Sequence, residues 1–274
     1  MLVRPIPSTG ELIPAIGLGS WKVFDVGTST SVRKGPRTVL DEFIRLGGTV
    51  VDSSPMYGRS EQVIGDLARD LGVTERLFMA TKVWTTGRDK GIHEMRESMR
   101  RMGVTRMDLM QVHNLVDVDT HLETLGQWKA EGLIRYLGVT HYTSSAHAEV
   151  GRVLDRHKVD FLQINYSVVE REVERWLLPM CRERGIAVMA NRPFATGELT
   201  QQLRRRQLPP IAVELQCQSW AELLLKFVVS HPAITCAIPA TGSIEHLRQN
   251  MAAGNDPMPT DRQRWEIGKA VSGD

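Results

Sequence analysis

The first half of the chain carries polar residues whose types and spacing suit acid-catalysed chemistry on a carbonyl group. Asp52 ends the apolar run TVVD, Lys82 lies in ATKV, and His113 ends MDLMQVH. Tyr57 follows Asp52 closely in the stretch VVDSSPMYG. Together these residues supply an anion, a cation, an imidazole and a proton donor, which is the set that such chemistry needs. Taken singly, each of them could merely begin a loop, cap a helix or face solvent.

The elements that would position these residues alternate along the chain. Short apolar runs typical of strands are followed by segments with apolar residues at helical spacing, which indicates a parallel sheet covered by helices. Eight such units predict a closed (β/α)8 barrel formed as one domain by residues 1–274, and an open doubly wound sheet is the alternative. The strands are expected near residues 16, 49, 78, 109, 135, 161, 187 and 234.

Turn and capping residues predict where several elements begin and end. Residues 1–15 are expected to form a hairpin that turns at Ser8 to Glu11. The first helix is expected to begin near Pro36, and the second to follow Ser60 as its N-cap. Capping boxes predict two later helix starts, at Thr120-x-x-Glu123 and Ser219-x-x-Glu222. Helices are also expected over residues 146–157 and 173–184 and from about residue 243.

The composition excludes several classes of protein. A formal net charge of +2 favours neither nucleic acid nor an anionic membrane as a partner, and the basic cluster at residues 204–206 is predicted to be a solvated face or loop. No stretch reaches the ~18 apolar residues of a membrane span, and the N-terminus lacks the pattern of a secretion signal. Three cysteines without a Cys-x-x-Cys pair favour reduced thiols in the cytoplasm, although a removed leader would leave no trace. No metal site is expected, and nothing in the sequence indicates the oligomeric state.

A (β/α)8 barrel assembles its active site at the carboxyl ends of its strands. The polar residues at those predicted strand ends are expected to meet at one mouth. They are Asp52, Lys82, His113, Gln163, Asn165 and Asn191.

The order Asp52, Tyr57, Lys82, His113 resembles the catalytic tetrad of the aldo-keto reductases. VDSSPMYG is similar to that family's D-T-A-x-x-Y-G segment, TKV to its lysine strand, and MDLMQVHN to its aspartate-leucine-histidine strand. Further similar segments cover almost the whole chain in the family's order: GLGSW, LQINYS, NRPF and IPATGSIEHLRQN.

The resemblance implies a reductase that converts an aldehyde or ketone to an alcohol. Tyr57 would be the general acid, and Lys82 would lower the pKa of the tyrosine. Asp52 would hold Lys82 charged and oriented, and His113 would hydrogen-bond the substrate oxygen. The hydride must come from a cofactor, because no side chain supplies one. The chain contains no Gly-x-Gly-x-x-Gly after a strand, so a Rossmann site is disfavoured.

The resemblance also implies that a nicotinamide dinucleotide lies across the barrel mouth, with NADPH favoured over NADH. Lysine, serine and arginine, which are common in the family's C-terminal motif, are replaced by Ala240, Thr241 and His246, and Arg248 is a nearby substitute cation. The C-terminal segment 240–274 is expected to contact the cofactor and to add packing helices. The implied cofactor-binding residues are Gly19, Ser20, Trp21, Thr140, His141, Gln163, Asn191, Arg192, Pro193, Phe194, Ala240, Thr241, His246, Gln249 and Asn250.

The expected substrate is a small carbonyl compound in a pocket walled by Trp21, Phe24, Met56 and Trp84. A nucleotide-binding regulatory or interaction subunit with little turnover is the main alternative function. A barrel hydrolase or isomerase is a third, but it would need paired carboxylates or a metal set at the strand ends, where only Asp52 qualifies.

Overall fold

The computed structural model describes residues 1–273, and its centre is a sheet of eight parallel strands that lie side by side in chain order. Isolated parallel bridges join Ile16 to Ala237 and Gly19 to Ala240, so the first strand of the sheet meets the last. The predicted barrel is confirmed, and the doubly wound alternative, whose strand order would reverse, is excluded. The strands are β3 (Leu18–Gly19), β4 (Val50–Asp52), β5 (Phe78–Val83), β6 (Met107–His113), β7 (Ile134–Thr140), β8 (Phe161–Asn165), β9 (Ala187–Asn191) and β10 (Cys236–Ala237).

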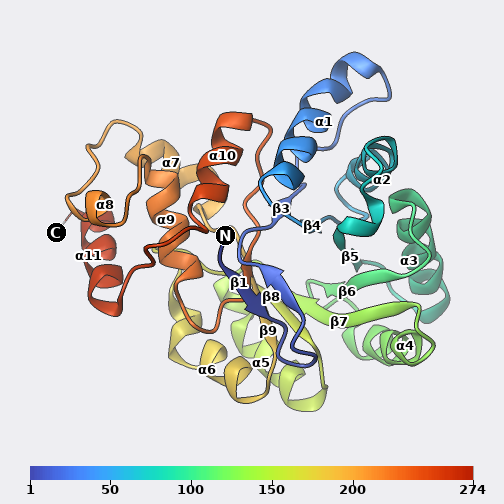
Figure 1. The fold of residues 1–274 in the computed structure, drawn as a ribbon. Coiled ribbons are helices and arrows are strands. Elements are labelled where there is room, and N and C mark those ends of the chain that lie inside the picture. The colour runs from blue at the N-terminus through green and yellow to red at the C-terminus, as the bar shows by residue number, and fades with distance from the viewer. Residues whose placement is uncertain (274) are drawn as a thin grey trace.

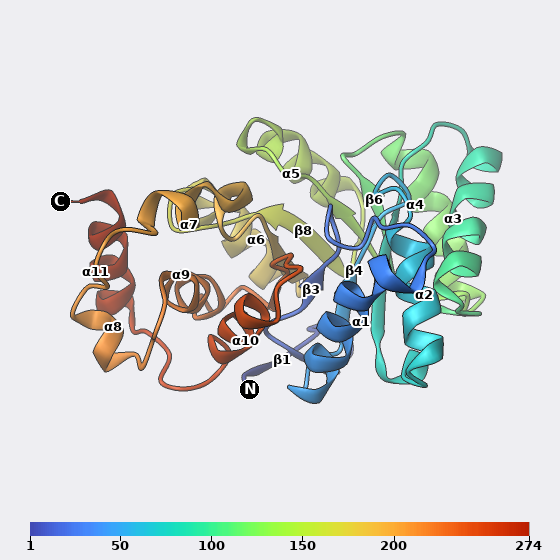
Figure 2. The ribbon, with the colours of Figure 1, turned by 90° about the horizontal axis from the view of Figure 1, so that it is seen from above.

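Helices follow the strands and surround the barrel (Figure 1). The helices are α1 (Thr30–Arg45), α2 (Ser60–Asp70), α3 (Arg88–Met102), α4 (Val118–Ala130), α5 (His147–Arg156), α6 (Leu177–Glu183), α7 (Glu198–Leu203), α8 (Ile211–Glu214), α9 (Trp220–Val229), α10 (Ile244–Ala252) and α11 (Asp261–Ser272). Seen from above, the first helix, α1, and the helix that follows β10, α10, lie side by side (Figure 2). The first and last parts of the barrel therefore meet in the layer of helices as well as in the sheet.

Successive side chains along each strand point to opposite faces, and this alternation separates two apolar clusters. On β5, Phe78 and Ala80 belong to the cluster inside the barrel, whereas Met79 and Val83 belong to the cluster between strands and helices. Lys82 continues the inward series of β5. The same alternation on the other strands places a layer of polar residues inside the barrel, above the apolar interior.

The N-terminal hairpin closes the lower end of the barrel, as predicted. Its strands, β1 (Val3–Pro5) and β2 (Leu12–Pro14), pair antiparallel. Ile6 and Ile13 are almost fully buried and pack in the cluster inside the barrel. A hydrogen bond between the hydroxyl groups of Thr9 and Tyr136 ties the turn to β7.

Two predicted helix starts are wrong. The first helix begins at Thr30, so Pro36 lies within it rather than in its first turn. Burial of Pro36 and of the apolar face that follows it outweighs the hydrogen bond that a proline cannot donate. The predicted capping box at Thr120 does not form, because α4 already begins after Asp117 and the Thr120 hydroxyl donates to the Asp117 carboxylate.

Other helix boundaries predicted from the sequence are right or partly right. Ser60 is the first residue of α2 rather than its N-cap, and its hydroxyl donates to the backbone carbonyl of Ser20. Ser219 does cap α9, since its hydroxyl accepts the Glu222 N–H. The helix expected over residues 173–184 is interrupted at Trp176, whose backbone is not helical.

No helix within residues 1–273 has both the length and the apolar character needed to cross a membrane.

Two glycines on the helices provide a test of how closely α2 and α3 pack. A Cβ at Gly65 on α2 would lie 2.1 Å from the backbone carbonyl oxygen of Arg101, whereas a Cβ at Gly126 on α4 would meet no atom within 4 Å. We expect Gly65→Ala to lower the thermal midpoint, because backbone must move apart. Gly126→Ala is the matched control and should raise the midpoint, since alanine favours a helix by up to about 1 kcal/mol over glycine. If both substitutions changed the thermal midpoint equally, the close approach of α2 and α3 would be contradicted.

Candidate active site

A buried ion pair between β4 and β5 lies at the centre of the upper barrel. Lys82 Nζ is 2.9 and 2.8 Å from the two carboxylate oxygens of Asp52 and 2.6 Å from the Ser53 carbonyl oxygen. Both side chains are almost completely buried, at 0% and 3% exposure. The three ammonium hydrogens therefore all have acceptors, which is the condition under which a charged lysine is tolerated inside a protein.

Interior amides complete the environment of the Asp52 carboxylate. Gln163 on β8 donates from Nε2 to Asp52 Oδ1 at 2.8 Å, and its Oε1 accepts the Thr140 hydroxyl at 3.1 Å. Gln111 on β6 also points its Nε2 toward Asp52 Oδ1, at 3.5 Å. The carboxylate is thus held from three strands besides its own.

A tight turn carries Tyr57 back over this ion pair. The Tyr57 N–H donates to the Ser54 carbonyl, with Pro55 as the second residue of the turn, where its fixed φ favours the conformation. Gly58 follows with a positive φ of 59°, and a Cβ there would lie 2.4 Å from the Asp25 carboxylate. Glycine is therefore required next to the tyrosine, because the chain needs both the left-handed conformation and the space.

Tyr57 is half-buried beside both Lys82 and His113. Lys82 Nζ lies 5.4 Å from the centroid of the tyrosine ring, and the His113 ring meets it edge to face with centroids 6.1 Å apart. The Tyr57 hydroxyl has no hydrogen-bond partner among residues 1–273. Burial raises the pKa of Tyr57, and the lowering effect of Lys82 only partly offsets it. Lys82 thus lowers the pKa of Tyr57, as expected, but burial is the larger effect and the net pKa is raised.

His113 is a neutral imidazole at physiological pH. Burial, with smaller contributions from Lys82 and His141, lowers its pKa to about 3. Its Nδ1 lies 3.1 Å from the Ser54 hydroxyl, and the ring lines the same cavity as Tyr57. A neutral ring in this position can donate a hydrogen bond without carrying charge.

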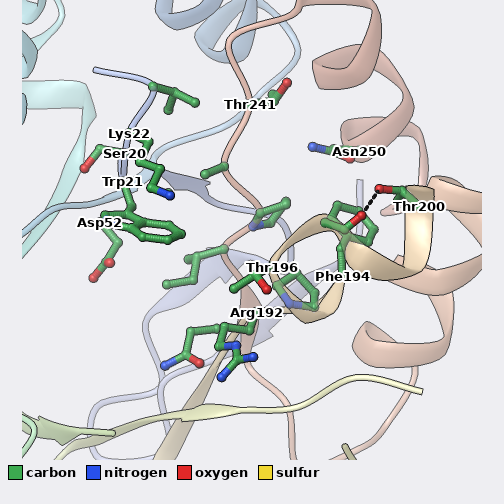
Figure 3. Close-up of a pocket in the computed structure, with 18 of the residues that line it drawn as sticks. Ser20, Trp21, Lys22, Asp52, Arg192, Phe194, Thr196, Thr200, Thr241 and Asn250 are labelled. Carbon is green, nitrogen blue, oxygen red and sulfur yellow. Dashed lines mark hydrogen bonds between the residues drawn. The ribbon is translucent and has the colours of Figure 1, made fainter. Parts of the chain in front are cut away.

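These residues open into a cavity of about 1120 Å³. In Figure 3, Ser20, Trp21, Lys22 and Asp52 lie on one side of the view, while Thr200 and Asn250 lie on the other. The cavity thus extends from the barrel mouth to the helices that follow β9 and β10. Besides the tetrad members Asp52, Tyr57 and His113, the implied cofactor residues that line it are Gly19, Ser20, Trp21, Thr140, Gln163, Asn191, Arg192, Pro193, Phe194, Ala240, Thr241, His246, Gln249 and Asn250.

Several lining residues carry buried polar atoms that have no hydrogen-bond partner within residues 1–273. They are the Oδ1 atoms of Asn114, Asn191 and Asn250, and Nε of Arg192. Buried polar groups are normally hydrogen-bonded, so unpartnered ones need an explanation. A polar ligand along the cavity would supply these partners.

The loop after β9 has an unusual backbone at the same place. Arg192, Ala195 and Thr196 all have positive φ, at 52°, 48° and 59°. Each such residue costs of order 1–3 kcal/mol, and such conformations cluster at ligand clamps. The loop therefore fits a role in holding the ligand of the cavity.

Three residues do not lie where the sequence led us to expect. Phe24 is 1% exposed and packs in the outer core, so it does not wall the cavity. His141 does not line the cavity either, because its ring stacks on Tyr142 and accepts the Tyr142 N–H. Asn165 instead bonds His147 and Glu170 behind the mouth.

Sequence reasoning also missed residues that line or support the site. Gln111 was hidden inside an apolar run, although its spacing of two from His113 places both inside the barrel. Asn114, Tyr142 and Arg204 line the cavity from loops whose paths no periodicity indicates. Arg248, the expected substitute cation, is instead paired with Glu42 on α1 at 2.8 Å, outside the cavity lining.

The pKa of His113 predicts how stability depends on pH. Between about pH 6.5 and 3 the unfolded chain binds a proton at this residue and the folded protein does not, so stability falls as the pH is lowered through this window. For one group the slope is at most about 1.4 kcal/mol per pH unit. We expect the difference in thermal midpoint between the protein and His113→Gln to shrink or reverse from pH 7 to pH 4.5. A difference that is constant with pH would contradict a neutral, buried His113.

Comparisons with known proteins agree with this architecture. The chain is 30% identical over 260 residues to methylglyoxal reductase YeaE of Escherichia coli strain K12, with 92% of this chain and 89% of that protein covered. It is 22% identical to an NADH-specific methylglyoxal reductase of the same organism, with 92% and 93% covered. An aldo-keto reductase from Klebsiella pneumoniae, solved in complex with NADPH, superposes with a TM-score of 0.81 at 28% identity, over 99% of this chain and 96% of that one.

The sequence model of the aldo/keto reductase family matches residues 15–266, which span the barrel from before β3 into α11. Because that match takes in every strand of the barrel and the residues around the cavity, the chain belongs to the aldo-keto reductase family.

Proposed function

We propose that this protein reduces an aldehyde or ketone to an alcohol, with Tyr57 as the proton donor. One observation carries the proposal: the Tyr57 hydroxyl, which has no partner in the described chain, stands in the cavity next to a buried Lys82–Asp52 pair and a neutral His113. An acid, a fixed cation and a neutral donor beside one open space are what reduction of a carbonyl requires.

The raised pKa of Tyr57 keeps the phenol protonated until a carbonyl oxygen beside it gains charge. Lys82 then stabilises the phenolate that proton donation leaves, and Asp52 prevents the ammonium group from moving. His113, as a neutral donor, holds the carbonyl oxygen toward Tyr57. Positioned proton donation of this kind contributes roughly 10² to 10⁴ in rate.

The cavity fits a nicotinamide dinucleotide. Its volume of about 1120 Å³ exceeds what a small carbonyl compound needs, and unpartnered polar atoms occur both at the barrel mouth, on Asn191, and on α10, at Asn250. When bound, the dinucleotide would supply the hydride. Gln163 accepts the Thr140 hydroxyl and donates to Asp52, so contacts from Gln163 or Thr140 to a cofactor would add to an existing network rather than fill vacant positions.

We propose NADPH as the preferred dinucleotide and NADH as the alternative. Lys22, Arg192 and Arg204 line the cavity, so cations are available although the family's usual lysine and arginine are replaced. The Klebsiella pneumoniae structure contains NADPH, whereas one Escherichia coli relative is NADH-specific, so the family includes both choices.

The substrate we propose is a small carbonyl compound, with methylglyoxal as the first to test because a relative with 30% identity to this chain is a methylglyoxal reductase. Trp21, Met56, Trp84 and Tyr142 border the cavity and are 42–48% exposed. Their apolar faces favour substrates with an apolar part next to the carbonyl.

The cysteines support a cytoplasmic setting. Cys181, Cys217 and Cys236 are free and buried, and burial raises the pKa of each thiol. Unpaired thiols of this kind are typical of proteins in a reducing compartment.

Replacement of the proton donor tests the proposal. Tyr57→Phe should lower kcat for NADPH-dependent reduction of methylglyoxal by at least about 10², since the acid is lost. The matched control is Tyr136→Phe, which removes a phenol hydroxyl at the opposite end of the barrel and should leave kcat unchanged. NADPH binding, measured by fluorescence, should survive in both variants. Binding without turnover on any of a panel of aldehydes, ketones and quinones would favour a regulatory subunit instead.

The cofactor preference is tested by removing a cation. Arg204 lines the cavity and forms no ion pair within residues 1–273, whereas Arg248 is paired with Glu42. If Arg204 contacts the phosphate that distinguishes NADPH from NADH, Arg204→Gln should raise the Kd for NADPH by about tenfold and leave that for NADH unchanged. Arg248→Gln should change neither Kd. Equal weakening of both cofactors would show that Arg204 does not recognise that phosphate.

A further inference from the structure

Ser54 contacts the catalytic histidine from inside the turn that carries Tyr57. Its Oγ lies 3.1 Å from Nδ1 of His113, and both residues are buried. The other contact of this hydroxyl is with the Met56 N–H, which donates to Oγ at 3.4 Å. One serine hydroxyl therefore links the backbone of the turn to the imidazole ring.

The two possible tautomers of His113 differ in how well they satisfy this hydroxyl. A neutral imidazole carries its hydrogen on either Nδ1 or Nε2, and the ring is neutral because its pKa is about 3. With hydrogen on Nε2, Nδ1 is an acceptor and takes the Ser54 hydroxyl hydrogen. With hydrogen on Nδ1, the ring donates to Oγ, and the hydroxyl hydrogen then has no acceptor in residues 1–273.

The Met56 N–H also favours the tautomer of His113 with hydrogen on Nε2. It uses a lone pair of Ser54 Oγ and offers no acceptor for the hydroxyl hydrogen. A buried hydroxyl whose hydrogen lacks an acceptor is unfavourable, so the surrounding atoms select the first tautomer. His113 Nε2 has no partner in the described residues, and the ring borders the cavity. In the selected tautomer, its N–H is free to donate to a ligand there.

We propose that Ser54 is a positioning residue that holds His113 in the Nε2–H tautomer, so that the ring can donate a hydrogen bond to the carbonyl oxygen of the substrate. The inference rests on the proposed function for the substrate, but the tautomer itself is a property of the protein alone. Alanine occupies the corresponding place in the D-T-A-x-x-Y-G motif that VDSSPMYG resembles, so the turn does not need the serine in order to form.

Nitrogen NMR of the imidazole tests the tautomer directly. In protein labelled with ¹⁵N at histidine, at pH 7 and without substrate, His113 should show a protonated Nε2 and an unprotonated Nδ1. In Ser54→Ala both nitrogens should move toward intermediate shifts, because both tautomers become populated, and Ser54→Thr should restore the original pattern. Ser98→Ala is the matched control, since Ser98 also has a buried hydroxyl but lies on α3 and forms no hydrogen bond to a histidine within residues 1–273.

Kinetic measurements distinguish a positioning role of Ser54 from a merely structural one. Ser54→Ala should lower kcat about tenfold with an unchanged Kd for NADPH, Ser54→Thr should recover most of the loss, and Ser98→Ala should behave like the unaltered protein. A protonated Nδ1 in the unaltered protein, or an unchanged tautomer in Ser54→Ala, would overturn the inference whatever the activity. Turnover that is indifferent to Tyr57→Phe would overturn the proposed function but leave the tautomer result intact.

Discussion

The buried pair of Lys82 and Asp52 is the interaction on which the upper barrel depends. Two unlike charges are almost wholly removed from water, and removal of either partner from such a pair costs about 3–5 kcal/mol because the other is left uncompensated. The barrel meets this constraint by directing a backbone carbonyl at the ammonium group and two interior amides at the carboxylate. The charge next to Tyr57 is therefore fixed before any ligand arrives.

Burial, more than the nearby charge, keeps Tyr57 and His113 neutral beside Lys82. Burial raises the pKa of the phenol and lowers that of the imidazole, so each is in its hydrogen-bond-donating form at pH 7. The same low-polarity surroundings strengthen the field of Lys82 at the tyrosine ring. In the proposed reaction, proton donation by Tyr57 would rely on charge that develops during the reaction, not on a phenolate formed in advance.

The lower end of the barrel contributes to stability, whereas the upper end has the features of a binding site. The hairpin fills the lower end with Ile6 and Ile13. The upper end is polar, contains buried atoms without a partner in residues 1–273, and is bordered by a loop with positive φ at Arg192, Ala195 and Thr196. Strain and unsatisfied groups are unfavourable for folding alone, so their concentration at the mouth fits a site that a ligand completes. The family assignment agrees with this division.

The sequence by itself determined the barrel and the hairpin, because strand alternation and helical spacing are local patterns that a closed barrel repeats in a fixed way. Strand-end position also predicted that Asp52, Lys82 and His113 lie at the same end of the barrel. It could not place Phe24 or Arg248, since a loop residue turns inward or outward according to packing partners that are distant in the chain. Only the tertiary structure showed that burial outweighs Lys82 at Tyr57 and that Ser54 contacts His113, because desolvation and hydrogen-bond direction depend on all the elements that surround a group.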